Sequence, residues 1–170
     1  MNYLPEIKKA LKKFYENDSI LIRSKLHEMT FVYRIAKYLS EQLENNGNKI
    51  DCEYHGMIKE DEVLRKSVEW KTGERIRIRP DIIYHQRSQP GETGHNFFCI
   101  EVKLRSPGED KNKVRDIMNE LNYEQGFCIC NVGKNYITVY EIIADNGDKK
   151  HRYKIKSLNN EITLEEVNNG

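Results

Sequence analysis

The chain has 170 residues, which at a domain size of about 150 residues predicts a single domain and excludes two full ones. Hydrophobic residues make up 38% and charged residues 32%, so the chain is polar but has enough apolar side chains for a core, which excludes disorder throughout. The 28 basic and 27 acidic residues give a formal net charge of +1, which excludes histone-like binding of DNA over the whole surface.

The start of the chain and the cysteines both indicate a cytoplasmic protein. The first residues, MNYLPEIKKALKKF, are amphipathic and charged, unlike a signal peptide, and no apolar run approaches the roughly 18 residues of a membrane span. The cysteines have no zinc-ligand spacing and lie in β-like apolar runs, so we expect buried, reduced thiols without a disulfide or structural metal. They are Cys52, Cys99, Cys128 and Cys130.

The N-terminal third predicts two helices. Apolar residues recur at helical spacing from Leu4 to Tyr15 and again from Leu26 to Leu43. The sequence Asn17-Asp18-Ser19 supplies a stop between the two helices, and Gly47 supplies a C-terminal signal for the second.

Short β-like runs and one helix then follow. The predicted strands are 49–57, 75–86, 96–105, 126–132, 136–143 and 152–158, and the predicted helix includes residues 114–121. The segment 58–71 is left open between a short helix and a charged loop. This order predicts an α+β or mixed-sheet α/β layered domain, in which the helix between Arg105 and Gly126 is a crossover that joins two parallel strands.

Two carboxylates are predicted to meet on neighbouring strands. Strand alternation places Glu101 and Lys103 on one face. The turn between the strands predicts a register in which residue numbers sum to about 182, so Asp81 stands opposite Glu101. Pro80 suggests an edge position or a bulge that could shift this register by one residue. Adjacent carboxylates repel unless a cation lies between them, so the pair suits Mg²⁺ or Mn²⁺, and Lys103 could orient or deprotonate a water.

The two strands carry a recognisable motif: Pro80-Asp81, then nineteen residues, then Glu101-Val102-Lys103. This motif resembles that of the PD-(D/E)XK nuclease superfamily. The wider runs Arg-Pro-Asp-Ile-Ile-Tyr-His at 79–85, Ile-Glu-Val-Lys at 100–103 and Tyr-Glu-Gln-Gly at 123–126 look like one group of small stand-alone bacterial members. The resemblance covers about residues 20–143 of a single domain spanning 1–170. It implies a restriction-endonuclease-like core, α-β-β-β-α-β, with an extra N-terminal helix and C-terminal strands.

The resemblance also implies roles for individual residues. Asp81 and Glu101 would bind the metal, the carbonyl of Val102 would be an extra ligand, and Lys103 would position the water. Superfamily members usually carry another acidic residue on the first core helix, and Glu28 is the matching candidate. Glu28 heads the apolar row that is expected to pack on the sheet. His27 is a secondary ligand candidate, because some RNA-cleaving relatives use a helix histidine.

Each role has a plainer alternative. Asp81, Glu101 and Lys103 could form a cross-strand salt-bridge cluster on a solvated face, and Glu28 could be a carboxylate favoured by the helix dipole. Glu53 could lie near the site on the first strand or be an ordinary outward charge.

Basic residues gather in the middle of the chain, where residues 63–87 hold seven basic and three acidic side chains. Arg75, Arg77 and Arg79 share the parity of Asp81 and could contact phosphates, or they could form a solvated face. Lys111 and Lys113 could also contact a nucleic-acid backbone, although Lys113 could simply pair with Asp110.

We therefore expect a Mg²⁺- or Mn²⁺-dependent endo- or exonuclease that acts on DNA rather than RNA in restriction, defence or repair. The main alternative is a non-catalytic binding or assembly subunit of a larger nucleic-acid-processing complex. A second alternative is an RNA-directed nuclease, for which His27 as a ligand would be the discriminating feature. Cutting both strands of a duplex calls for two such sites, which favours a homodimer or a partner subunit. No membrane partner is expected.

Overall fold

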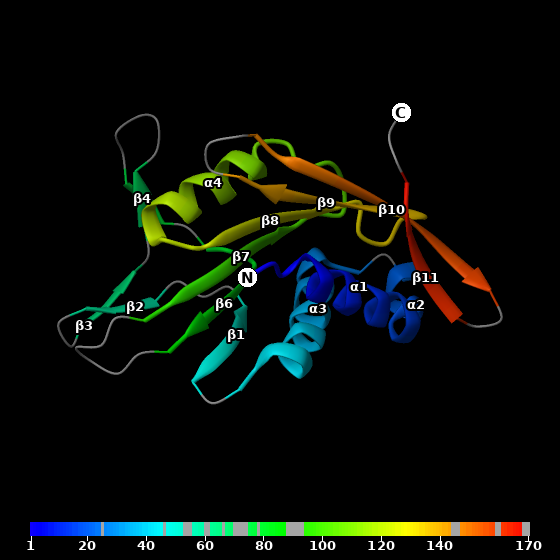
Figure 1. Cartoon of the computed structure of the whole chain (residues 1–170), viewed down its shortest axis with the longest axis horizontal. Coiled ribbons are helices and arrows are strands. Elements are labelled where there is room, and N and C mark those ends of the chain that lie inside the picture. The colour runs from blue at the N-terminus through cyan, green and yellow to red at the C-terminus, as the bar shows by residue number, and fades with distance from the viewer. Residues whose placement is uncertain are drawn as a thin grey trace.

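The computed structural model shows a mixed α/β fold (Figure 1). It describes residues 1–24, 26–45, 47–52, 56–59, 62–65, 67–69, 75–77, 79–87, 94–143, 147–158 and 161–167. For the short strands between residues 56 and 77 it describes the backbone alone. Of the helices in the described residues, none is long and apolar enough to span a bilayer.

Both predicted N-terminal helices are confirmed. They are α1 (Leu4–Asn17) and α3 (Glu28–Leu43), with the short α2 (Ser19–Arg23) between them. The apolar stripe of α1 and that of α3 are buried, because their i, i+3, i+4 spacing turns them to one side of each helix. The fully buried members are Ile7, Ala10, Leu11, Phe14, Val32, Ile35 and Leu39.

The main sheet of the described residues has seven strands in the order β1-β6-β7-β8-β9-β10-β11. They are β1 (Asn48–Cys52), β6 (Ile82–Gln86), β7 (Asn96–Val102), β8 (Gln125–Cys130), β9 (Tyr136–Ile142), β10 (Lys149–Leu158) and β11 (Glu161–Glu166). Every neighbouring pair is antiparallel except β7 and β8, which are parallel. Helix α4 (Asp110–Leu121) connects these two strands, so the predicted crossover is confirmed.

Two strand predictions for the segment before β6 are wrong. The run 49–57 ends as a strand at Cys52, and the run 75–86 is two strands, because Pro80 lacks the amide that a continuous ladder needs. The open segment 58–71 contains strands rather than a helix. Outside the main sheet, β2 (Gly56–Lys59) pairs with β3 (Glu62–Arg65), and β4 (Ser67–Glu69) pairs with β5 (Arg75–Arg77).

Proline does not place β6 at an edge of the described sheet, since β6 lies between β1 and β7. The register shift that Pro80 led us to expect occurs at the other end of the strand, between Tyr84 and His85.

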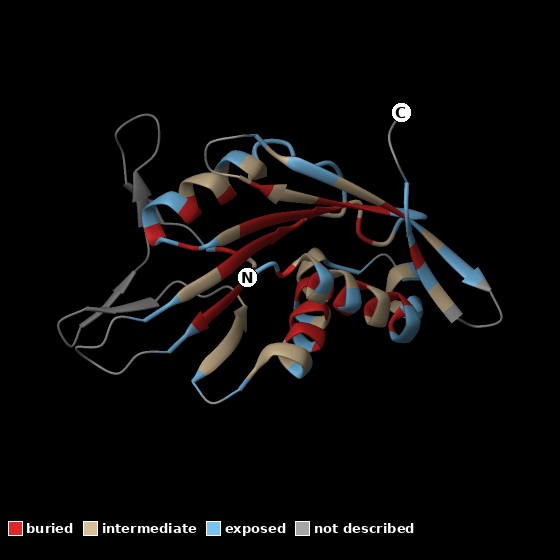
Figure 2. Cartoon of the chain, in the orientation of Figure 1, coloured by how far each residue is buried: buried red, intermediate tan, exposed pale blue. Residues whose placement is uncertain are grey.

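Helices cover both faces of the sheet. In Figure 1, α1 and α3 lie below the sheet and α4 lies above it. The sheet residues that face α1 and α3 include Ile82, Phe98 and Ile100, whereas Ile83 and Cys99 face α4. Figure 2 shows the resulting band of buried residues through β6, β7 and β8. These central strands are therefore packed on both faces.

Candidate functional site

Asp81 lies directly before β6, and its carboxylate extends the pairing of β6 with β7. Ile82 pairs with Ile100, so residue numbers sum to 182 as predicted. One residue before that pair, Asp81 Oδ2 accepts a 2.7 Å hydrogen bond from the amide of Val102. The carboxylate therefore takes the place of a backbone carbonyl and is fixed beside Glu101.

Glu101 is a buried carboxylate near the end of β7, only 1% exposed. Its Oε1 accepts a 2.6 Å hydrogen bond from Lys113 Nζ, whereas its Oε2 has no hydrogen-bond partner among the residues that the structure describes. The nearest charge to Oε2 among the ion pairs is Lys103 Nζ, at 3.6 Å. A buried carboxylate oxygen without a hydrogen bond is costly, which makes this atom the most informative in the site.

Lys103 follows β7 and lies among several carboxylates. Its Nζ is 3.3 Å from Glu28 Oε1, 3.6 Å from Glu101 Oε2 and 3.9 Å from Asp110 Oδ1. Glu101 and Lys103 therefore point to the same side, as strand alternation predicts. Asp110 at the start of α4 reaches Lys103 rather than Lys113, the partner considered for it from the sequence.

Glu28, the first residue of α3, connects this helix to the segment after β7. Its Oε1 is 3.3 Å from Lys103 Nζ, and its Oε2 accepts a 3.2 Å hydrogen bond from the amide of Leu104. Both oxygens thus contact the segment that follows β7. His27 lies just before α3 and is exposed, and in the described part of the chain no hydrogen bond or ion pair joins it to these residues.

Lys113 is a member of the cluster that sequence analysis did not place there. Its Nζ lies 2.6 Å from Glu101 Oε1 and 3.3 Å from the carbonyl oxygen of Arg79. The sequence signal for this contact is weak, because it depends on how α4 is rotated over the sheet. In the sequence, the only indications that Lys113 could lie near the site are its charge and its position on the crossover helix.

Burial is the largest influence on the ionisation of the cluster. The pKa of Glu101 is raised to about 7, mainly by burial and then by the negative charge of Asp81. Burial likewise raises the pKa of Asp81, against the lowering effect of the hydrogen bond from Val102. Burial would lower the pKa of Lys103, but the surrounding carboxylates, led by Asp81, outweigh it and raise that pKa. Lys103 is therefore a persistent ammonium.

The other predicted nucleic-acid contacts lie outside this cluster or outside the described side chains. Lys111 is 3.0 Å from Asp148 and lies over the ring of Tyr140. Arg79 is exposed. The side chains of Arg75 and Arg77, and all of Glu53, lie outside the described residues. Their roles in binding nucleic acid or metal stay predictions.

The donor set fits a hard divalent cation in part. Across the described ranges, no three His, Cys, Asp or Glu side chains converge to hold a metal ion. Glu28, which was predicted as a third carboxylate, faces Lys103 and the Leu104 amide instead. Asp81 and Glu101 nevertheless supply oxygen ligands of the kind that Mg²⁺ prefers, with waters completing its shell. Oε2 of Glu101, which accepts no hydrogen bond from any described residue, is the available acceptor.

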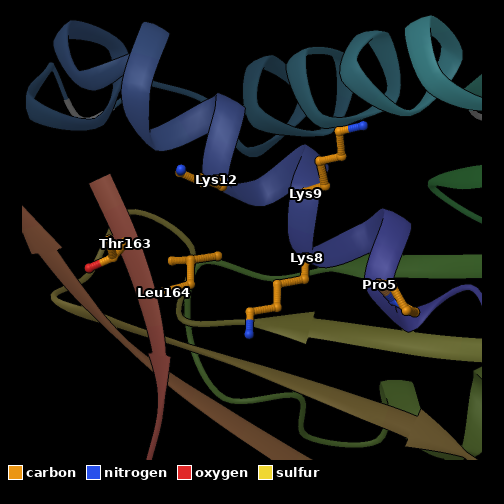
Figure 3. Close-up of a pocket in the computed structure, with 6 residues that line it drawn as sticks. All are labelled: Pro5, Lys8, Lys9, Lys12, Thr163 and Leu164. Atoms are coloured by element: carbon orange, nitrogen blue, oxygen red, sulfur yellow. The ribbon is translucent and has the colours of Figure 1, made fainter. Parts of the chain in front are cut away.

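A concave feature lies away from these residues, between α1 and β11 (Figure 3). It is an open groove of about 300 Å³, lined by Pro5, Lys8, Lys9, Lys12, Thr163 and Leu164. Lys8 Nζ lies 4.9 Å from the centre of the Tyr153 ring, so this lysine already has a favourable contact. None of the carboxylates or lysines of the cluster lines this groove.

Comparisons with protein-family models, curated proteins and solved structures found no match to this chain.

Proposed function

We propose that this chain is a Mg²⁺- or Mn²⁺-dependent nuclease that resembles the PD-(D/E)XK superfamily. The observation that carries the proposal is the Glu101 carboxylate, which is 1% exposed and has one oxygen without a hydrogen-bond partner in the described part of the chain. It lies beside Asp81, another carboxylate whose pKa is raised by burial. A solvated salt-bridge cluster would not bury an acceptor in this way.

The order of elements supports the proposal. Helix α3, strands β1, β6 and β7, helix α4 and strand β8 follow one another along the chain, with β2 to β5 between β1 and β6. With β2 to β5 set aside, this order agrees with the α-β-β-β-α-β core that the proposal assumes. The Asp81 carboxylate directly before β6 and the Glu101 side chain near the end of β7 lie on neighbouring strands, which supports the proposed pairing of these two groups at one site.

Each residue would have a distinct task. Asp81 and Glu101 would hold the cation, with the carbonyl of Val102 as a further ligand. A divalent ion bound there would offset charge on a scissile phosphate and make a water more acidic. Because its pKa is raised, Lys103 would orient the water or a phosphate oxygen rather than deprotonate it. Glu28 would hold the Lys103 ammonium in place, since the two groups are 3.3 Å apart.

The proposed substrate is DNA rather than RNA. The RNA-directed alternative depends on His27 as a ligand, and the contacts described above do not bring His27 to the cluster. Restriction, defence or repair is the setting that such an activity would serve. Cleavage of both strands would call for a homodimer or a partner subunit.

A cleavage assay tests the proposal. Single- and double-stranded DNA and RNA are incubated with the wild type, Asp81→Asn or Lys103→Met in Mg²⁺, Mn²⁺ or EDTA. We expect metal-dependent cutting of DNA that falls at least about 100-fold in both variants. Lys156→Met removes an equal charge from β10, where Lys156 pairs with Glu165, and should leave cutting unchanged.

The absence of cutting on every substrate, together with no Mn²⁺ binding that depends on Asp81, would reject the nuclease. That result would favour the alternative, a non-catalytic subunit of a nucleic-acid-processing complex.

A further inference from the structure

Lys113 from α4 is bonded to the Glu101 carboxylate, which is one of the two proposed metal ligands. Lys113 Nζ is 2.6 Å from Glu101 Oε1, whereas Lys103 Nζ is 3.6 Å from Oε2 of the same group. Lys113 is thus the closer of the two counter-ions. Without one, a carboxylate that is 1% exposed would be a buried, uncompensated charge whenever it ionised.

Among the described residues, Lys113 Nζ makes two hydrogen bonds. Its hydrogen bonds go to Glu101 and to the carbonyl oxygen of Arg79, at 2.6 and 3.3 Å. Its side chain is 28% exposed, so the flexible stem has access to solvent. Lys103, by contrast, lies within 4 Å of three carboxylates and would keep two of them if Glu101 turned to another cation.

A divalent cation and an ammonium compete for such a site. Both are positive, and the repulsion between like charges is strong at a few ångströms in a partly buried setting. We propose that Lys113 is a built-in competitor of the metal: it neutralises Glu101 in the metal-free protein and is displaced when a divalent cation binds. This inference rests on the proposed function, because it presumes that Asp81 and Glu101 bind the cation.

Calorimetric titration with Mn²⁺ at pH 8 tests the exchange. Lys113→Met removes the competing charge, so we expect it to bind Mn²⁺ roughly 5- to 150-fold more tightly than the wild type. Lys113→Gln keeps a hydrogen-bond donor for Glu101 without the charge and should also bind more tightly. Arg115→Met removes the same charge from the same helix, but Arg115 pairs with Asp148, so its affinity should stay within about twofold of the wild type.

A second measurement uses the wild type alone. Amine acetylation followed by mass spectrometry reports how accessible each lysine is. Mn²⁺ should raise the labelling rate of Lys113 several-fold and leave that of Lys111, which is 3.0 Å from Asp148, unchanged. This readout does not depend on whether a Lys113 variant folds.

The outcomes separate this inference from the proposed function. If the wild type binds Mn²⁺ through Asp81 but neither Lys113 variant binds more tightly and Lys113 labelling does not change, the exchange is rejected and the metal site stands. If the wild type shows no Mn²⁺ binding that Asp81→Asn removes, both the metal site and the exchange are rejected.

Discussion

The protonation of the Glu101 carboxylate is coupled to folding, because its pKa differs between the folded and the unfolded chain. Its pKa is raised from 4.5 to about 7, so between these values the folded protein holds a proton that the unfolded chain has released. The stabilising contribution of this proton is fully present below about pH 4.5 and is lost as the pH rises through 7.

A pH series of thermal unfolding in EDTA tests this coupling. From pH 5 to pH 8, the melting temperature of the wild type should fall relative to that of Glu101→Gln, which carries a neutral amide at every pH. The glutamine oxygen can still accept the hydrogen bond from Lys113, so the comparison isolates the titration. Parallel curves for the two proteins would show that the pKa of Glu101 is not raised.

Glu28 fixes the start of α3 against the end of β7 through two acceptors. We expect Glu28→Ala to lower the free energy of unfolding by about 1–2 kcal/mol, because the Leu104 amide and the Lys103 ammonium both lose a partner. Glu28→Gln keeps an oxygen that can accept from the amide and should cost less than half as much. Urea denaturation of the three proteins measures this, and equal losses in both variants would contradict the assignment.

Helix α4 positions Lys113, and Gly126 sets how closely this helix approaches β8. A Cβ atom built at Gly126 would overlap the side chains of Met118 and Val114. Methionine can move aside, but valine is stiff, so the helix itself would have to shift.

Gly126→Ala should therefore lower the free energy of unfolding by about 1–3 kcal/mol. It should also weaken the contact of Lys113 with Glu101. In a double-mutant cycle with Val114→Ala, the double variant should lose less stability than the two single variants together, because they relieve the same overlap. Additive losses would mean that the close approach is not what limits this position.

The apolar periodicity of the sequence predicted the helices and strands that bury one face against the core. The apolar stripes of α1, α3 and α4 gave these helices, and the turn after β6 gave the register in which Ile82 pairs with Ile100. The patterns failed between β1 and β6, where short charged strands have no clear period. They also missed β11, whose sequence EITLEE has only two apolar residues, Ile162 and Leu164.

The site was predictable only where it followed from strand pairing. Parity and register brought Asp81, Glu101 and Lys103 together, since both are properties of neighbouring strands. The contact of Lys113 with Glu101 depends on the rotation of α4, which close packing at Gly126 determines. No local pattern contains that information.

The core of the molecule extends beyond the segment that resembles the nuclease superfamily. From α1, Phe14 is fully buried, and from β10 and β11, Tyr153 and Leu164 belong to the same cluster as Phe98 in β7. The N-terminal helix and the C-terminal strands are thus part of the core rather than additions to it.

A fragment of residues 20–143 should therefore fail to fold. It loses Phe14, Tyr153 and their neighbours, and truncating a single large core side chain already costs about 3–5 kcal/mol, a large part of a domain's stability. Amide spectra and thermal unfolding of the fragment and the full chain compare the two. A dispersed spectrum and a cooperative transition in the fragment would show that the outer elements are dispensable.

At the scale of the whole molecule, we propose that the sheet and its helices place Asp81 and Glu101 to hold a divalent cation. Anomalous difference density from crystals grown with Mn²⁺ tests it most directly. We expect a peak at roughly 2.1 Å from carboxylate oxygens of both residues. A peak held only by other residues, or none at a Mn²⁺ concentration that saturates cleavage, would contradict it.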